Sequence, residues 1–364
     1  MQAAERAAWL RLLLTPGLGP RTARKLLAHF GLPDAIFDAG PSALVRVVPE
    51  PLAHELSQPP STAIQSAADA TEHWLAASSN HALLTLADSD YPQALLTTAD
   101  PPIVLFAVGR LDLLNRPAVA IVGSRNATQQ GMANAEGFAT ALARAGVTVV
   151  SGLALGIDAA AHRGALAAGS DASTVAVVGT GVDVAYPSSN RALTQQIRAG
   201  GLVISEFPLR TPAIAHNFPR RNRVIAGLAK GVLVVEAALR SGSLITARLA
   251  AEAGREVFAI PGSIHSPFSK GCHKLIREGA KLVETAQDVL DELKLPGLRG
   301  APAAPADEAP RNSIIAAMGA DPCDLDTLIA RTRIGPEALA AALVELELEG
   351  HVTALPGGQW QRVA

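Results

Sequence analysis

The sequence at positions 118–125 reads Ala118-Val119-Ala120-Ile121-Val122-Gly123-Ser124-Arg125, an apolar run that ends in a glycine turn. Its apolar residues lack the alternation of a strand with one face in water, which indicates a strand buried on both faces. Further runs of this kind are found at 148–150, 174–178, 202–205, 232–235 and 257–260. Helical patterns lie between and after them, at 130–145, 157–168, 191–199, 220–229, 244–253 and 273–279. This succession predicts an α/β domain over residues 81–295, with a doubly wound, Rossmann-like and mostly parallel sheet.

Smaller modules are predicted on either side of this domain. Residues 1–80 have helical patterns, and the turn Gly17-Leu18-Gly19 resembles that of a helix–hairpin–helix or SAM-like module, although an ordinary interhelical turn remains open. Residues 296–312 contain four prolines among alanine, glycine and acidic residues, which predicts an extended linker. Residues 313–364 predict helices at 324–332 and 336–349 and a hairpin at Pro356-Gly357-Gly358, which together form a winged helix.

Composition limits the class of protein. The 364 residues are 49% hydrophobic and 18% charged, as expected for a folded protein of two or three domains. No apolar run is long enough to span a membrane, and we recognise no secretory signal. Cys272 and Cys323 form neither a metal pattern nor a disulfide framework. We therefore expect no metal, no cofactor, no membrane partner and a cytoplasmic location.

The charge is distributed unevenly. Residues 215–281 hold 11 Lys and Arg against 4 Asp and Glu, a net charge of +7, which indicates a localised groove for an anion. Residues 282–364 hold 6 basic against 13 acidic residues, a net charge of −7. Within the predicted winged helix, Glu337, Glu345, Glu347 and Glu349 occupy the helix that reads DNA in duplex-binding modules. A protein partner therefore fits this module better than duplex DNA.

The loops after the predicted strands carry residues that suit an anion. Gly123 permits close backbone approach, Ser124 offers a hydroxyl group, and Arg125 offers a forked donor for phosphate. Ser241-Gly242-Ser243 opens a later helix, and the N–H groups of a helix N-terminus favour anions. Since ligands bind at the carboxyl ends of the strands in this fold, these loops predict one crevice. A G-x-G-x-x-G fingerprint and a P-loop are both absent, which argues against a bound dinucleotide and against ATP hydrolysis by those routes.

A cluster of cations follows at Phe218-Pro219-Arg220-Arg221-Asn222-Arg223, where a helix is predicted to begin. The helix dipole repels cations at this end, so a bound phosphate would stabilise the arrangement. Phe218 adds a surface on which a base can stack, and phosphate donors beside an aromatic surface are typical of proteins that bind single-stranded nucleic acid. A solvated basic turn is the alternative for this segment taken alone.

Acidic groups near the predicted crevice have local explanations as well as functional ones. Asp158 and His162 lie one helical turn apart and could pair, or Asp158 could cap its helix while His162 is satisfied locally. Glu206 could act in catalysis, although local hydrogen bonding is the favoured reading.

The motifs of the α/β domain, taken in order, are Tyr91-Pro92 with Asp100-Pro101-Pro102, Gly123-Ser124-Arg125, Ser151-Gly152-x-Ala154-x-Gly156-Ile157-Asp158-x-x-Ala161-His162, Gly179-Thr180-Gly181-x-Asp183-x-x-Tyr186-Pro187, Ser205-Glu206, Phe218-Pro219-x-Arg221-Asn222-Arg223, Ser241-Gly242-Ser243 and Pro261-Gly262. This succession resembles the DNA-processing protein A family, DprA or Smf, and the flanking modules are similar to its long bacterial form. One departure is that no basic residue lies near Tyr186-Pro187, where the family pattern leads us to expect one.

The resemblance implies a protein that is not an enzyme. It would bind and protect incoming single-stranded DNA during natural transformation, load the RecA recombinase onto it, and work as a homodimer. Arg125 and Arg223 would be the main phosphate contacts. The full set of residues expected to bind DNA is Gly123, Ser124, Arg125, Asn126, Gly152, Phe218, Arg220, Arg221, Asn222, Arg223, Ser241, Gly242, Ser243 and Thr246. The residues expected near the dimer or RecA surface are Cys272, Leu275 and Ile276.

An enzyme on the same sheet is the alternative. The sheet also resembles that of nucleoside-monophosphate phosphoribohydrolases, which need a P-G-G-x-G-T-x-x-E loop to supply a glutamate for cleavage of the glycosidic bond. The corresponding loop here spans residues 240–247, and Arg248 stands where the acid is needed. The sequence therefore favours DNA binding over this chemistry.

Overall fold

The computed structural model describes residues 2–169, 171–295, 314–315, 317–318, 323–332, 334–355 and 358–363. The chain divides into two compact units, Met1–Leu298 and Arg299–Ala364. No helix in the described ranges has the length and apolar character needed to cross a membrane.

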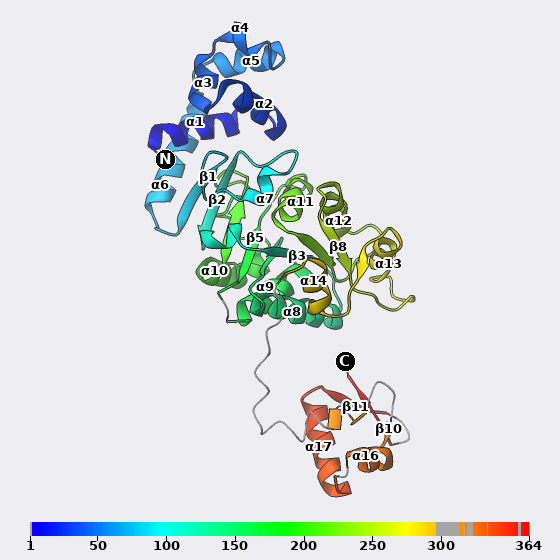
Figure 1. Cartoon of the computed structure of the whole chain (residues 1–364). Coiled ribbons are helices and arrows are strands. Elements are labelled where there is room, and N and C mark those ends of the chain that lie inside the picture. The colour runs from blue at the N-terminus through cyan, green and yellow to red at the C-terminus, as the bar shows by residue number, and fades with distance from the viewer. Residues whose placement is uncertain are drawn as a thin grey trace. The chain divides into compact units, whose positions relative to one another are not determined.

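A nine-stranded sheet forms the centre of the first unit, in the order β1-β2-β6-β5-β4-β3-β7-β8-β9 (Figure 1). Its strands are β1 (His81–Thr85), β2 (Val104–Gly109), β3 (Ala118–Val122), β4 (Thr148–Ser151), β5 (Thr174–Val177), β6 (Leu202–Ser205), β7 (Gly231–Val234), β8 (Glu256–Ala259) and β9 (Lys281–Leu282). Pairing is parallel from β6 to β9 and antiparallel between β1 and β2 and between β2 and β6. The mostly parallel sheet is thus confirmed, and β1, β2 and β9 extend it beyond the strands that the sequence predicts.

Helices cover both faces of the sheet, as the lack of alternation in the strands predicts. On β3, Val119 and Ile121 face one cluster of buried residues, while Ala120 and Val122 face another. The helices of this region are α7 (Gln93–Leu96), α8 (Gln129–Arg144), α9 (Ile157–Ala167), α10 (Arg191–Gly200), α11 (Asn217–Leu228), α12 (Ser243–Glu252), α13 (Lys270–Arg277) and α14 (Ala286–Glu292), with 3-10 turns η1 (Leu111–Asn115) and η2 (Ser188–Asn190). Figure 1 shows α8, α9 and α14 on one side of the sheet and α11 and α12 on the other.

The N-terminal helices pack directly on the antiparallel part of the sheet. They are α1 (Ala3–Leu14), α2 (Pro20–Phe30), α3 (Pro33–Asp38), α4 (Pro41–Leu44), α5 (Glu50–Ser57) and α6 (Thr62–Ala76). Trp9 and Leu26 share one hydrophobic cluster with Val104 and Phe106 of β2, so this helical module belongs to the same compact unit as the sheet. Arg6 of α1 donates from Nε to Oε1 of Glu72 on α6 at 2.6 Å, which fastens the two helices together.

The second unit is a winged helix. Its described elements are β10 (Cys323–Asp324), α16 (Leu325–Thr332), α17 (Pro336–Leu348), β11 (Val352–Leu355) and β12 (Gln359–Arg362). The strands form a small sheet in the order β10-β12-β11, packed around Leu328, Leu339 and Leu343. The predicted helices and the antiparallel hairpin are confirmed. The predicted linker at 296–312 and the turn residues Pro356 and Gly357 lie outside the described residues.

Candidate nucleic-acid groove

A groove of about 790 Å³ opens at the carboxyl ends of the strands. It lies where β3 is flanked by β4 on one side and β7 on the other, the point at which the strand order reverses and ligands bind in such sheets. The predicted residues that line it are Gly123, Ser124, Arg125, Asn126, Phe218, Arg221, Asn222, Ser241, Gly242, Ser243 and Thr246. The fold therefore joins three segments that are far apart in the sequence.

The loop after β3 presents an unpaired cation. Arg125 is exposed, has no acidic partner among the described residues, and lies with its guanidinium carbon 5.9 Å from the centre of the Phe218 ring. Glu236, just after β7, holds the end of this loop by accepting from the backbone N–H and the hydroxyl group of Thr128 at 3.0 and 2.6 Å. Gly123 is needed for a reason other than phosphate approach, because a Cβ there would lie 2.6 Å from the Ile157 side chain.

The start of α12 forms the opposite wall of the groove. The N-cap residue of α12 is Gly242, and Ser241 accepts from the first N–H groups of the helix: that of Ser243 donates to the Ser241 hydroxyl group at 3.3 Å and that of Leu244 to the Ser241 carbonyl at 3.2 Å. Ser241 and Ser243 hydrogen bond to one another through their hydroxyl groups at 2.7 Å. The dipole of this ten-residue helix favours an anion at its N-terminus. Arg240 also lines the groove and was missed as a site residue, although it directly precedes the Ser-Gly-Ser motif.

Arg221 lines the groove from below, as part of its floor. Its side chain is buried, and its guanidinium donates to the backbone carbonyls of Gly152 and Val177 at the ends of β4 and β5. Burial lowers the pKa of Arg221 to about 10, so it stays charged at neutral pH. Asp158 accepts from the N–H groups of Gly152 and Ala154 at 3.1 and 3.3 Å. Arg221 therefore supports the floor of the groove and places a positive charge below it.

Arg223, expected as a main phosphate contact, does not line the groove. It donates to the carboxylate of Glu206 and to the backbone carbonyl of Asp100. Successive residues of α11 point about 100° apart, so Arg220, Arg221 and Arg223 cannot share one direction. Arg220 is half exposed and lies 3.8 Å from Glu206, also outside the groove lining.

The buried carboxyl of Glu206 belongs to this ion-pair cluster. Burial raises the pKa of Glu206, while the charges of Arg223 and Arg220 oppose that rise. A carboxylate held between two guanidinium groups is not free to act as a catalytic acid, and the favoured reading of local hydrogen bonding therefore fits the structure.

A smaller hollow of about 70 Å³ adjoins the groove beside Phe218. Gly152, Gly179 and Thr180 form part of its lining, so Gly152 lies beside the groove rather than in it. The exposed ring of Tyr186 lies 5.5 Å from that of Phe218 at a tilt of 36°. Tyr186 was missed as a site residue because the sequence drew attention only to the lack of a basic neighbour.

His162 does not pair with Asp158. Its Nδ1 lies 2.7 Å from the Thr174 hydroxyl group, and burial lowers the pKa of His162 to about 3. Asp158 does not cap its helix either, since its carboxylate accepts from N–H groups of the preceding loop and the N-cap residue of α9 is Gly156. The ring of His162 has a partner at Nδ1 but, among the residues that the structure describes, none at its buried Nε2. Within the described ranges, no group of three or more His, Cys, Asp or Glu residues could hold a metal ion.

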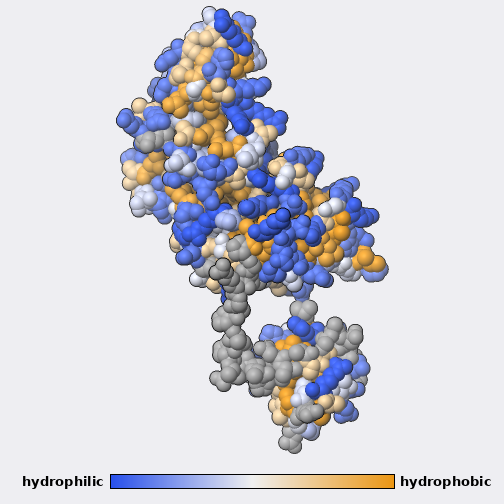
Figure 2. Space-filling model, in the orientation of Figure 1, coloured by the Kyte–Doolittle hydropathy of each residue, from blue (hydrophilic) through white to orange (hydrophobic). Residues whose placement is uncertain are grey.

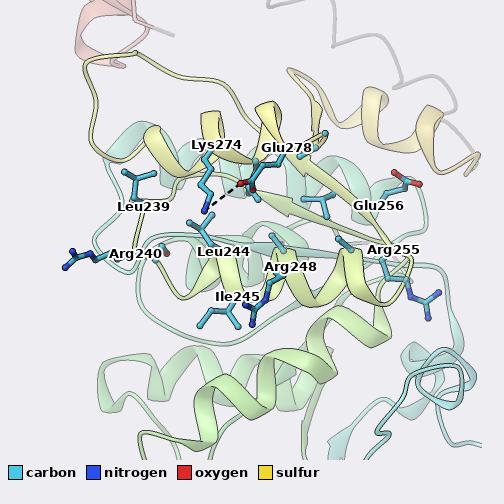
Figure 3. A pocket seen from close by; sticks show the side chains of 16 residues that line it. Leu239, Arg240, Leu244, Ile245, Arg248, Arg255, Glu256, Lys274 and Glu278 are labelled. Atoms are coloured by element: carbon cyan, nitrogen blue, oxygen red, sulfur yellow. Dashed lines mark ion pairs between the residues drawn. The ribbon is translucent and has the colours of Figure 1, made fainter.

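The α13 region corrects one expectation. Cys272 was expected near a partner surface, but its side chain is fully buried against β7, with Sγ 3.6 Å from the carbonyls of Val234 and Val235. Burial raises the pKa of this thiol to about 11, so it stays protonated at neutral pH. Leu275 and Ile276 are only partly buried against the core. Leu275 faces a hollow of about 660 Å³ between α12 and α13 (Figure 3).

Family models match all three parts of the chain. The model described as DNA recombination-mediator protein A matches residues 82–294. The DprA-like N-terminal HHH domain matches residues 3–49, and the DprA winged helix domain matches residues 299–358.

Individual proteins are similar over the same regions. The chain is 43% identical over 290 residues to Protein Smf of Escherichia coli strain K12, which covers 77% of each chain. It is similar in structure to DNA processing protein A from Streptococcus pneumoniae, with a TM-score of 0.62, 40% identity, and coverage of 77% of this chain and 95% of that one. DNA processing protein A from Helicobacter pylori, described for its single-stranded DNA binding mode, gives a TM-score of 0.53 at 32% identity, covering 58% of this chain and 95% of that one.

Proposed function

Because the chain belongs to the DNA recombination-mediator protein A (DprA/Smf) family, in its long form, we propose that it binds single-stranded DNA in the groove at the strand ends. The observation that carries the proposal is the meeting of unpaired Arg125, the N-terminus of α12 and the partly exposed ring of Phe218 in one groove. The binding mode described for the Helicobacter pylori relative supports it.

The two hollows suit the two parts of a nucleotide. Phosphates would lie between Arg125 and the start of α12, over the charge that Arg221 places below the groove. A base would stack on Phe218 and Tyr186 at the smaller hollow, where stacking contributes on the order of 1–3 kcal/mol per base. Because stacking needs an accessible base face, this arrangement favours single strands over duplex DNA.

The biological role that we propose follows the family resemblance. The protein would act in the cytoplasm, protect incoming single-stranded DNA during natural transformation, and load RecA onto it without catalysing a reaction itself. The alternative phosphoribohydrolase chemistry is disfavoured because Glu206 is paired with two arginines and Arg248 stands in place of the acid.

We further propose a homodimer through the β9 end of the sheet. The edge strand β9 carries exposed Leu282, and exposed Ile264 lies in the loop after β8, the strand that pairs with β9. Figure 2 shows hydrophobic surface over the end of the unit that carries α13. Light scattering should give a dimer for the wild type and a monomer for Leu282→Glu; a monomeric wild type would contradict the proposal.

Fluorescence anisotropy with labelled oligo-dT and a matched duplex across a salt series tests DNA binding. We expect single strands to bind more tightly, with a log–log salt slope of roughly −3 if about four phosphates are contacted. Arg125→Ala should lose most of the affinity, while Arg163→Ala, on the opposite helical layer, should keep it. Equal binding of duplex, or no binding of either DNA, would overturn the proposal.

A further inference from the structure

The hollow between α12 and α13 adjoins the groove directly. The two share Arg240, Ser241 and Ile245 in their linings, so Arg240 stands on the rim between them. Arg240 is exposed and has no hydrogen bond or ion pair within the described chain. A strand that leaves the groove past the start of α12 therefore meets a free cation first.

Both walls of the hollow carry cations. Arg248 lies on α12 and Lys274 on α13, and in Figure 3 Lys274 extends from α13 toward Leu244 of α12. Their ion pairs, Arg248 with Glu252 at 3.5 Å and Lys274 with Glu278 at 3.8 Å, join largely exposed side chains. Exposed pairs of this kind contribute little stability, so a phosphate can compete for both cations.

The hollow also has apolar lining residues. Leu239, Leu244 and Leu275 supply aliphatic surface against which bases can pack. Gly279 and Ala280, which directly precede the edge strand β9, also line it. The hollow therefore includes both residues that it shares with the groove and the segment that precedes β9.

We propose that single-stranded DNA continues from the groove over Arg240 into this hollow, with phosphates contacting Arg248 and Lys274. This inference rests on the proposed function of the groove, which it extends to a second DNA-binding segment. The ligand that we propose for the hollow is the sugar-phosphate backbone of a single strand. If the hollow binds another protein and no DNA, the inference is wrong.

The test compares DNA lengths in wild type and the double variant Arg248→Ala/Lys274→Ala, with Arg163→Ala as the control. Arg163 forms an ion pair with Glu136, at 2.9 Å and with both side chains partly exposed, on the other face of the sheet. An oligo-dT of about 6 nucleotides, near the size of one binding site, should bind all three proteins equally. An oligo-dT of about 20 nucleotides should bind the wild type and the control more tightly than the double variant. With two phosphate contacts removed, the salt slope of the double variant should be shallower by about 1.4, which is about sevenfold in affinity over a fourfold change in salt.

Each outcome has a definite meaning. The same length dependence and salt slope in wild type and double variant would overturn the inference and leave the groove intact. Failure of the short oligonucleotide to bind the wild type would overturn the proposed function and this extension with it. Lys274→Arg should keep the wild-type slope, because it retains the charge.

Photo-cross-linking of the wild-type protein is a second measurement. It needs no substitution, so a change in oligomeric state caused by a variant cannot affect it. A long oligo-dT with a photoreactive thymidine near one end should cross-link to peptides that contain Arg248 or Lys274. Cross-links confined to the loop after β3 and to α11 would overturn the inference.

Discussion

The loop after β3 and the start of α11 both carry arginines toward the same groove, yet the structure uses them in opposite ways. Arg125 on the loop is exposed and has no acidic partner among the described residues. Arg221 and Arg223 on α11 are buried or nearly so, and both donate to carbonyl or carboxylate oxygens. A basic segment in a DNA-binding protein can therefore support the site rather than touch the ligand.

The difference follows from what each segment packs against. The loop is fastened at its end, by Glu236 to Thr128, which leaves Arg125 facing solvent. The helix α11 packs on the sheet, so its arginines point toward the strand ends and toward Glu206. Substitutions in the two segments should consequently affect different properties, namely stability in α11 and DNA affinity in the loop.

The largest effect on stability is expected from Arg221→Ala. It leaves the carbonyls of Gly152 and Val177 without their donor and Asp158 without its neighbouring charge. Removing one member of such a buried arrangement costs about 3–5 kcal/mol. Urea unfolding should show this loss relative to wild type, and Arg163→Ala should lie within about 0.5 kcal/mol of wild type. A small change in the free energy of unfolding for Arg221→Ala would show that α11, like the loop after β3, does not stabilise the fold through its arginine.

Arg223→Ala should have a somewhat smaller effect. Its side chain is 14% exposed, so water can partly solvate Glu206 after the change, and we expect a loss of about 2–3 kcal/mol. The salt slope of single-strand binding should stay unchanged, since Arg223 does not line the groove. A shallower slope by about 0.7, measured by anisotropy, would show that Arg223 contacts a phosphate and that the contrast fails.

Acidification should weaken the buried region through His162. Burial holds the pKa of His162 at about 3 in the folded chain, below its unfolded value of about 6.5, so the unfolded chain binds more protons between these values. The stability that neutral His162 contributes is therefore present above pH 6.5 and is lost as the pH falls toward 3, by about 1.4 kcal/mol per pH unit. Urea unfolding at several pH values should show a shallower pH dependence in His162→Gln than in wild type.

The smallest effect on stability is expected from Arg125→Ala, which should change the free energy of unfolding by less than about 0.5 kcal/mol. Its effect on DNA should be large by contrast, with a salt slope shallower by about 0.7 for the lost phosphate contact. Marked destabilisation of Arg125→Ala in urea would contradict the assignment of the loop to ligand binding.

The sequence predicts the central fold well, because parallel strands buried on both faces leave a distinctive pattern. The strands β3 and β6 begin and end where that pattern places them; β4 and β5 differ by one residue at one end, and β7 and β8 by one residue at both ends. The two-residue strand β9 escapes prediction, and so do β1 and β2, although β2 is almost wholly buried, with the N-terminal helices packed on one of its faces. The antiparallel pairing of β1 and β2 depends on contacts that short-range patterns do not encode.

The site is predicted less completely, because the sequence does not show in which direction each side chain points or which distant residue it pairs with. The motifs bring the right loops together, but whether an arginine faces the groove depends on its position around α11 and on distant acids such as Glu206. Cys272 shows the same limit, since nothing local reveals that its side of α13 packs on β7. Arg240 and Tyr186 line the groove, and the motifs quoted for the family do not mark either as a binding residue.

The two hydrogen bonds from Thr128 to Glu236 also affect the kinetics of DNA binding. A loop that is already fastened before DNA arrives need not become ordered on binding, so the loss of conformational freedom falls mainly on the DNA strand. Encounter would then be set by diffusion and by the basic charge around the groove, which vary little among single substitutions. Variants of this protein should accordingly differ from one another mainly in how long the DNA stays bound, not in how fast it arrives.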